Sequence, residues 1–166
     1  MKHVWARRAT GDDTSWIVDL SARVQDALTA SGSRQQIGPL PLESTQRSIL
    51  AGNVFVLETT EKRLGSVLVD PLESFRLVEW ALPNEAGPWW YLHSLMLEPE
   101  EQGRKLGSVF LEEVKRLMAP LSGTIVLDCW AGNTKLRDFY RRAGFTSRGI
   151  FPVEDYYVMV FTWSLA

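Results

Sequence analysis

The stretch WWYLHSLMLEPEEQGRKLGSVFLEEVKRLM, residues 89 to 118, decides the fold. Its first nine residues are apolar on both faces, which predicts a buried and central β-strand over residues 89 to 97. A turn with a proline, acids, two glycines and two adjacent basic residues follows. Helical spacing then relates Leu106, Val109, Phe110, Val114 and Leu117, so we expect a helix over residues 104 to 118.

The segment after this helix predicts a second buried strand. TIVLDCW, residues 124 to 130, is again apolar on both faces. A strand, a helix and a strand in this order form a right-handed crossover in nearly all known cases. We therefore expect the strand at 89 to 97 and the strand at 124 to 130 to be parallel neighbours.

The last 34 residues predict one helix and two further strands. Asn133 fits the N-cap of a helix over residues 134 to 143, and Gly144 fits the left-handed residue that ends it. Alternating apolar residues then predict two antiparallel strands, at 146 to 153 and 156 to 163.

The N-terminal half has weaker patterns of the same kinds. The segment at residues 70 to 88 fits either a short helix or a long loop, because Phe75, Val78 and Leu82 have helical spacing among prolines and a glycine. The remaining segments predict a strand at 4 to 9, a helix capped near Asp13 or Thr14, a loop at 35 to 41, a helix at 42 to 50 and hairpin strands at 53 to 58 and 63 to 69. This order predicts one α/β domain with a mixed sheet over residues 1 to 166.

The composition bounds the class of protein. Hydrophobic residues make up 45% and charged residues 23%, which is typical of a globular chain. The net charge of −2 argues against nucleic acid as a partner, and no apolar run reaches the roughly 18 residues of a membrane span. The N-terminus lacks the apolar stretch of a signal peptide, and the single cysteine fits a reducing compartment, so we expect a cytoplasmic protein.

The turn at residues 102 to 107, QGRKLG, has the features of an anion site. It precedes a helix, whose first N–H groups have no partner within the helix and carry partial positive charge. Glycines leave room for a ligand, and Arg104 and Lys105 add charge, so a phosphate or pyrophosphate would suit it. The same features also fit an ordinary solvated turn. The turn matches neither a P-loop nor a GxGxxG dinucleotide fingerprint.

A second pattern lies in LDCWAGNTKLRDFYRRAGF, residues 127 to 145. Asn133 and Tyr140 are seven residues apart, so a helix brings them to one face, with Leu136 between them. Asn133 could bind an amide and Tyr140 offers a phenolic O–H. Alternatively, Asn133 is only a helix cap and Tyr140 only a partly buried aromatic.

Together, the two patterns resemble the Gcn5-related N-acetyltransferase family, in a bacterial form. That family has a Q/R-x-x-G-x-G/A loop after its fourth strand, which here is the stretch from Gln102 to Gly107. It also has an Asn after its fifth strand, a Tyr seven residues later, and then Gly-Phe, which here are Asn133, Tyr140 and residues 144 to 145. One departure is Lys105, which stands where the pattern has its first glycine.

The resemblance implies a fold and a cosubstrate. The sheet would be mostly antiparallel, with a parallel pair splayed at its fourth and fifth strands and helices on both faces. Acetyl-CoA would be the cosubstrate, and no metal would be needed. The residues that the resemblance assigns to it are Leu95, Met96 and Leu97 for the pantetheine, Gln102, Gly103, Arg104, Lys105, Leu106 and Gly107 for the pyrophosphate, and Asn133, Leu136 and Tyr140.

The resemblance also implies the catalytic role of Tyr140, which would protonate the departing thiolate. The general base varies within the family, so its candidates come from the residues of this chain: His93, Glu79 and Asp128. Histidine has a suitable ordinary pKa of about 6.5. Strand alternation would place His93 on one face with Tyr91, Leu95 and Leu97 if no bulge intervenes, although His93 could also be a hydrogen-bonded structural residue.

These features predict direct transfer of an acetyl group to a primary amine, which we expect to be a small molecule. Cys129 lies within a buried strand, where a lone thiol is usually inert, so we expect no covalent enzyme intermediate. Two alternatives remain: a non-catalytic acyl-CoA sensor, and a partner-binding domain that has lost the cosubstrate. The resemblance also allows a homodimer, because members of the family often form dimers.

Overall fold

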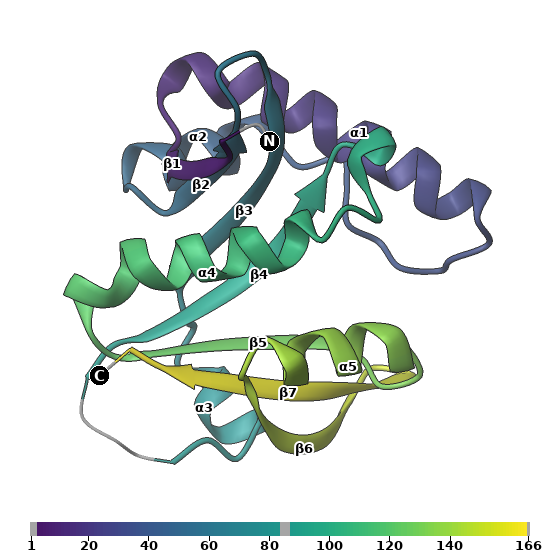
Figure 1. The fold of residues 1–166 in the computed structure, drawn as a ribbon. Helices are drawn as coiled ribbons and strands as arrows, with labels where there is room; N and C mark the ends of the chain where they lie inside the picture. Colours follow the sequence, from purple (N-terminus) through teal and green to yellow (C-terminus); the bar gives the residue numbers. More distant parts are fainter. Residues whose placement is uncertain (1–2, 84–86, 166) are drawn as a thin grey trace. The chain divides into compact units, whose positions relative to one another are not determined.

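The computed structural model describes residues 3 to 83 and 87 to 165 (Figure 1). The chain forms two compact units. Unit 1 consists of Met1–Leu68 and Ser94–Val114, and unit 2 consists of Val69–His93 and Lys115–Ala166. Strands β3 (Arg63–Pro71) and β4 (Trp89–Leu97) and helix α4 (Leu106–Met118) contribute residues to both units.

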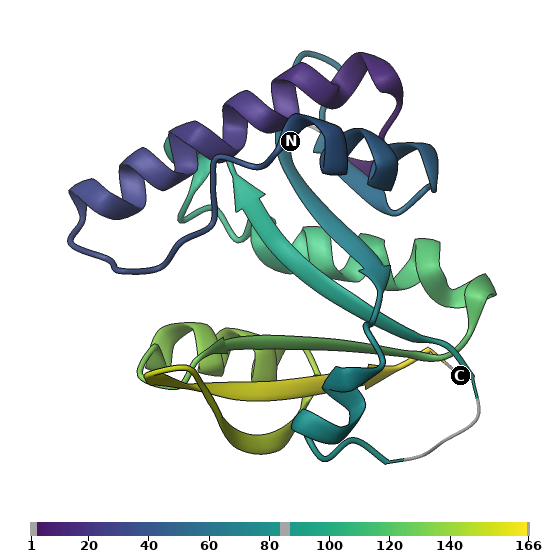
Figure 2. The same ribbon diagram turned by 180° about the vertical axis from the view of Figure 1, so that it is seen from behind.

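Unit 1 is a sheet segment with helices on its two faces. Helices α1 and α2 pack on one face through an apolar cluster that includes Ile17, Ile49 and Met96, and α4 lies on the other face (Figures 1 and 2). Both faces of β2 are therefore buried. The other elements of unit 1 are β1 (Trp5–Arg8), η1 (Gly11–Asp13), α1 (Thr14–Ala30), α2 (Leu42–Leu50), β2 (Val54–Glu58) and η2 (Pro99–Glu101).

Unit 2 has the same layered arrangement. One face of β5 and β7 packs in a cluster that includes Trp80, Val126 and Val160, and on the other face Tyr140 of α5 contacts the ring of Phe161. The elements of unit 2 are α3 (Phe75–Glu79), η3 (Ala119–Leu121), β5 (Thr124–Trp130), α5 (Thr134–Arg142), β6 (Thr146–Val153) and β7 (Tyr156–Ser164).

The seven strands form one mixed sheet in the order β1-β2-β3-β4-β5-β7-β6, so β4 is its central strand. Strands β4 and β5 are parallel, with Trp89 opposite Thr124, whereas the pairs β1–β2, β2–β3, β5–β7 and β6–β7 are antiparallel. The parallel pairing stops at Tyr91 and Val126. These findings confirm the predicted α/β fold, with a mostly antiparallel sheet and a parallel pair at its fourth and fifth strands.

Three local features differ from the predicted pattern or decide it. Helix α4 begins at Leu106 rather than Arg104, because Lys105 has a φ of 60°, outside the right-handed helical region. Of the two interpretations of residues 70 to 88, the short helix is correct over Phe75–Glu79, and residues 84 to 86 lie outside the described part. Ser94 has a φ of 54°, so β4 does not alternate regularly from Tyr91 to Leu97 as its prediction required.

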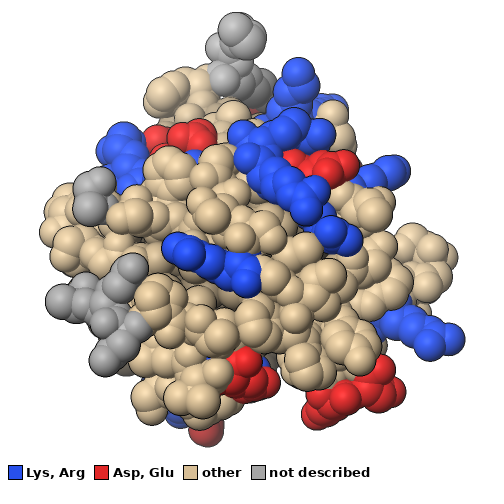
Figure 3. All heavy atoms as spheres, turned by 90° about the horizontal axis from the view of Figure 1, so that it is seen from below, with Lys and Arg blue, Asp and Glu red and all other residues tan. Residues whose placement is uncertain are grey.

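The surface and the helices agree with the charge pattern of the sequence. On the face that Figure 3 shows, Lys and Arg side chains are interspersed with Asp and Glu side chains. None of the helices in the described ranges is long and apolar enough to cross a membrane.

Candidate active site

The turn before α4, in unit 1, offers backbone donors for an anion. Within the described ranges, the backbone N–H groups of residues 102 to 108 make no hydrogen bond. Gly103 has a φ of 84°, and a Cβ there would meet no atom within 4 Å, so the space above it is open. A helix start with unbonded N–H groups and an open approach fits the pyrophosphate of a CoA thioester.

The charged side chains of this turn are partly neutralised by Glu101. This carboxylate is buried, and it accepts hydrogen bonds from Lys62 and from Arg104, the latter at 3.3 Å. The hydrogen bond to Glu101 raises the pKa of Lys62, so this lysine stays charged. The Arg104 side chain is still 70% exposed, which leaves it accessible to a ligand. Glu101 therefore connects the turn to the β2–β3 hairpin.

The end of β4 has one edge already occupied. The N–H of Glu98 donates to the carbonyl oxygen of Leu64 on β3 at 2.8 Å, and a Cβ on Gly65 would lie 2.4 Å from the carbonyl oxygen of Met96. Met96 itself is buried in the apolar cluster of unit 1. Within unit 1, β3 thus lies against β4 so closely that position 65 has no room for a side chain.

Unit 2 contains the Asn–Tyr pattern on α5. Asn133 is the N-cap of this helix, since its Oδ1 accepts the N–H of Leu136 at 3.0 Å, as predicted. Tyr140 is 6% exposed and packs between the rings of Phe145 and Phe161. Its hydroxyl makes no hydrogen bond to any residue in the described ranges. Burial, with the nearby Cys129 and Asp128, raises the pKa of Tyr140, so this hydroxyl keeps its proton.

A row of four polar side chains crosses three neighbouring strands of unit 2. Asp70 on β3 contacts His93 on β4, with 2.7 Å between Oδ2 and Nε2. The His93 ring stacks on the ring of Tyr91, with centroids 5.1 Å apart and an interplanar angle of 13°. The Tyr91 hydroxyl donates to Oδ1 of Asp128 on β5 at 2.5 Å. The sheet thereby brings together two of the predicted candidate bases, His93 and Asp128, through Tyr91.

Burial controls the protonation of this row at its β5 end. Burial raises the pKa of Asp128, although the Tyr91 hydrogen bond and the charge of Arg76 act in the opposite direction. Burial and the charge of Asp128 raise the pKa of Tyr91, so the shared proton stays on the phenol. Burial also raises the pKa of Cys129 to about 11, so its thiol is a poor nucleophile near neutral pH.

The third candidate base, Glu79, is not part of this row. Its carboxylate pairs with Arg76, one helical turn earlier on α3, at 3.2 Å. Within the described ranges, no hydrogen bond or ion pair joins Glu79 to His93 or Tyr140. Sequence analysis missed Asp70. Its only sequence signal is an acid that directly follows the apolar strand RLGSVLV.

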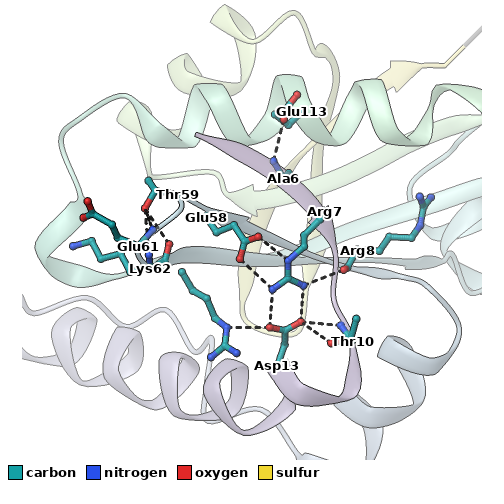
Figure 4. A network of polar contacts seen from close by, with 11 residues as sticks. Ala6, Arg7, Arg8, Thr10, Asp13, Glu58, Thr59, Glu61, Lys62 and Glu113 are labelled. Carbon is teal, nitrogen blue, oxygen red and sulfur yellow. Dashed lines mark hydrogen bonds and ion pairs between the residues drawn. The ribbon is translucent and has the colours of Figure 1, made fainter. Parts of the chain in front are cut away.

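A separate cavity of about 450 Å³ lies in unit 1, beside the β2–β3 hairpin. Trp16, Glu58, Glu98 and Glu100 line it together with residues 59 to 63. Its charges are largely paired among themselves: Arg7 bonds both Glu58 and Asp13 (Figure 4), and Arg23 bonds Glu98. No group of three His, Cys, Asp or Glu side chains that could hold a metal occurs among residues 3 to 83 and 87 to 165.

Comparison with known proteins identifies the fold and the site. Residues 24–145 match the model of the acetyltransferase (GNAT) family. The chain belongs to this family. GNAT membership confirms the predicted family, its N-acetyltransferase class and acetyl-CoA as the cosubstrate, and the unbonded N–H groups before α4 fit that cosubstrate.

Individual GNAT relatives agree with this assignment. The uncharacterized N-acetyltransferase YesJ of Bacillus subtilis (strain 168) is 31% identical over 153 residues, which are 87% of this chain and 83% of YesJ. A GNAT-family acetyltransferase from Listeria monocytogenes 4b F2365 has a TM-score of 0.78 at 21% identity, over 97% of this chain and 94% of that one. The structure of yncA from Salmonella typhimurium, which holds its cofactor acetyl-CoA, has a TM-score of 0.72 at 14% identity, over 99% and 95% of the two chains.

Proposed function

We propose that this GNAT acetyltransferase acetylates a primary amine of a small molecule, by direct attack of the amine on acetyl-CoA. The observation that carries this proposal is the chemistry of unit 2. It holds a proton acceptor, His93, beside the carboxylate of Asp70, and a proton donor, Tyr140, whose buried hydroxyl has a raised pKa. An N-acetyl transfer needs one group of each kind, whereas binding alone needs neither.

The cosubstrate would contact two sets of residues. In unit 1, the N–H groups of residues 102 to 107 would hold its pyrophosphate, and the backbone of Leu95, Met96 and Leu97 would pair with its pantetheine amides. In unit 2, Asn133, Leu136 and Tyr140 would contact it. Support comes from the unbonded N–H groups before α4 and from the open space above Gly103.

The proposed reaction balances with two proton transfers in the protein. Acetyl-CoA supplies an acetyl thioester, whose carbonyl carbon bonds to the amine nitrogen as the carbon–sulfur bond breaks. An alkyl ammonium first releases one proton to become a nucleophilic amine. His93 then takes a second proton from the same nitrogen onto its imidazole, and the Tyr140 hydroxyl gives its proton to the departing sulfur. Return of a proton to Tyr140 leaves one proton for solvent in each turnover.

A slender amine suits the exposure of the proposed base. The side chain of His93 is 28% exposed, and the Tyr91 ring covers one of its faces. Among proteins of similar structure, one is an agmatine N-acetyltransferase and another a ribosomal L7/L12 alpha-N-protein acetyltransferase, so the fold by itself allows either class of acceptor. The cover over His93 favours the small-molecule class. The predicted single domain, homodimer and cytoplasmic location stay predictions.

The test is an amine panel assayed for acetyl-CoA-dependent release of free CoA, with mass spectrometry of the products. Polyamines, amino acids, aminoglycosides and N-terminal peptides would make up the panel. We expect at least one small amine to gain an acetyl group. Binding of acetyl-CoA by calorimetry without turnover of any amine would instead support the acyl-CoA sensor, and no binding would support a domain that has lost the cosubstrate.

A further inference from the structure

The side chain of His93 is held from two sides within unit 2. On its edge, Nε2 lies 2.7 Å from Oδ2 of Asp70, and both side chains are about one-quarter exposed, at 28% and 25%. On its face, the ring of Tyr91 stacks at a centroid distance of 5.1 Å. The Tyr91 ring is itself fixed by its hydrogen bond to Asp128. Contacts on the edge and on the face together restrict both torsions of the histidine.

We propose that Asp70 is a positioning residue for His93, which selects the tautomer that acts as the base. This inference rests on the proposed function, because it assigns a partner to the proposed base. A carboxylate only accepts hydrogen bonds, so a neutral His93 beside it must carry its proton on Nε2. The lone pair is then on Nδ1, which becomes the basic nitrogen, and Asp70 stabilises the imidazolium that forms when Nδ1 gains a proton.

The geometry separates this role from that of an ordinary surface ion pair. A pair whose only function is stability holds two charges together, and it gains little when partly exposed. Here the partner of the carboxylate is a titratable ring, and a tyrosine anchored to another strand orients that ring. The tautomer and the orientation of His93 are therefore both determined by the protein.

The decisive variant is Asp70→Asn, which keeps the size of the side chain but can donate through its amide. An amide N–H that donates to Nε2 would move the ring proton to Nδ1 and remove the basic lone pair from that position. We expect kcat to fall by about 100-fold or more, since a positioned base typically contributes about 10²- to 10⁴-fold, while Kd for acetyl-CoA changes less than about twofold.

The tautomer can be read directly, because the chain has two histidines, His3 and His93. In a ¹⁵N-labelled His3→Gln background, the imidazole shifts belong to His93 alone. We expect the Nε2–H form in the parent and the Nδ1–H form in Asp70→Asn. Asp19→Asn, which changes an exposed aspartate of α1, is the matched control and should alter neither kcat nor the tautomer.

The outcomes distinguish this inference from the proposed function. If His93→Gln keeps the parent kcat, or if no amine is acetylated, the proposed function fails, while the ¹⁵N shifts still decide the assignment of Asp70. An Nδ1–H form in the parent, or the same tautomer in Asp70→Asn as in the parent, overturns the inference. So does an Asp70→Asn variant with the parent kcat when His93→Gln has lost activity. If circular dichroism shows that Asp70→Asn does not fold, Asp70→Ala is measured instead, and a mixture of tautomers is expected.

Discussion

The Tyr91 hydroxyl donates to Oδ1 of Asp128 at 2.5 Å, across the parallel strands β4 and β5. The two residues are 37 positions apart in sequence, and burial raises the pKa of each. The bond thus satisfies a carboxylate that the surrounding core disfavours as an anion. It also fixes the aromatic ring on which His93 stacks, so one buried hydrogen bond links the packing of the sheet to the proposed base.

Removal of this bond should destabilise the protein in a pH-dependent way. Because the folded-state pKa of Asp128 is raised, folding favours its neutral form, and this contribution is lost as the pH rises through the folded pKa. Tyr91→Phe removes the donor to the anion, so we expect the free energy of unfolding to fall by about 1 to 3 kcal/mol at pH 7 and by less at pH 4. Urea unfolding at both pH values measures this.

Tyr157→Phe is the matched control for this variant, because Tyr157 is on β7 with 59% of its surface exposed. It should change the free energy of unfolding by less than about 0.5 kcal/mol at either pH. An equal loss for Tyr91→Phe at pH 4 and pH 7 would argue that the Asp128 anion does not need the phenol.

Tyr140→Phe tests the proton donor. The variant keeps the ring contacts with Phe145 and Phe161 and removes only the hydroxyl, which makes no hydrogen bond within the described ranges. We expect kcat to fall by about 10- to 1000-fold, with little change in Kd for acetyl-CoA or in the melting temperature. Steady-state kinetics and calorimetry provide the two measurements. Unchanged turnover would exclude this role for Tyr140.

Lys105 combines a charge beside the anion-binding turn with a φ of 60°. This left-handed conformation costs a non-glycine residue about 1 to 2 kcal/mol, and glycine adopts it freely. Lys105→Ala removes the charge but keeps the strain, whereas Lys105→Gly removes both. We therefore expect the glycine variant to unfold with a free energy about 1 kcal/mol higher than that of the alanine variant.

Acetyl-CoA binding by the same pair of variants reports on the charge. If the ammonium attracts the phosphates, both variants should bind about 2- to 5-fold more weakly at low salt, as expected for an exposed ion pair. The difference from the parent should vanish at high salt. Tighter binding by Lys105→Gly would mean that the lysine side chain hinders the approach of the pyrophosphate.

Asp13 stabilises unit 1 through the network in Figure 4. The carboxylate is 1% exposed and accepts from Arg7 at 2.8 Å and from Arg63 at 3.0 Å. Burial alone would raise the pKa of Asp13, but the bonds from Arg7 and Thr10 and the charges of both arginines lower it. Asp13→Asn should therefore lower the free energy of unfolding at pH 7 by about 3 to 5 kcal/mol, because it leaves charged partners uncompensated.

The sign of the pH dependence follows from the lowered pKa of Asp13. The stabilisation is fully present above the ordinary aspartate value of about 3.9 and is lost as the pH falls through the folded pKa. The difference between the parent and Asp13→Asn should thus shrink at pH 3. Asp12→Asn changes the exposed neighbouring carboxylate and should have little effect at any pH. A difference that does not depend on pH would rule out the ion pairs as its cause.

The sequence by itself determined the elements and the class of ligand site. Apolar runs and helical spacing predicted β4 at residues 89 to 97, β5 at 124 to 130 and α5 with its Asn133 cap, because these features depend on neighbours within a few residues. The glycine-bearing turn before α4 and the Asn133–Tyr140 spacing predicted the GNAT family, which the comparison confirmed.

Only the tertiary structure decided which polar side chains meet. Asp70 and His93 are 23 residues apart, and Tyr91 and Asp128 are 37 apart, so their contacts depend on the order and register of three strands. The positive φ angles of Ser94 and Lys105 interrupt a strand and delay a helix at residues whose types do not favour that conformation. Side-chain partners across a sheet are determined by strand pairing, which the local pattern of a single strand does not contain.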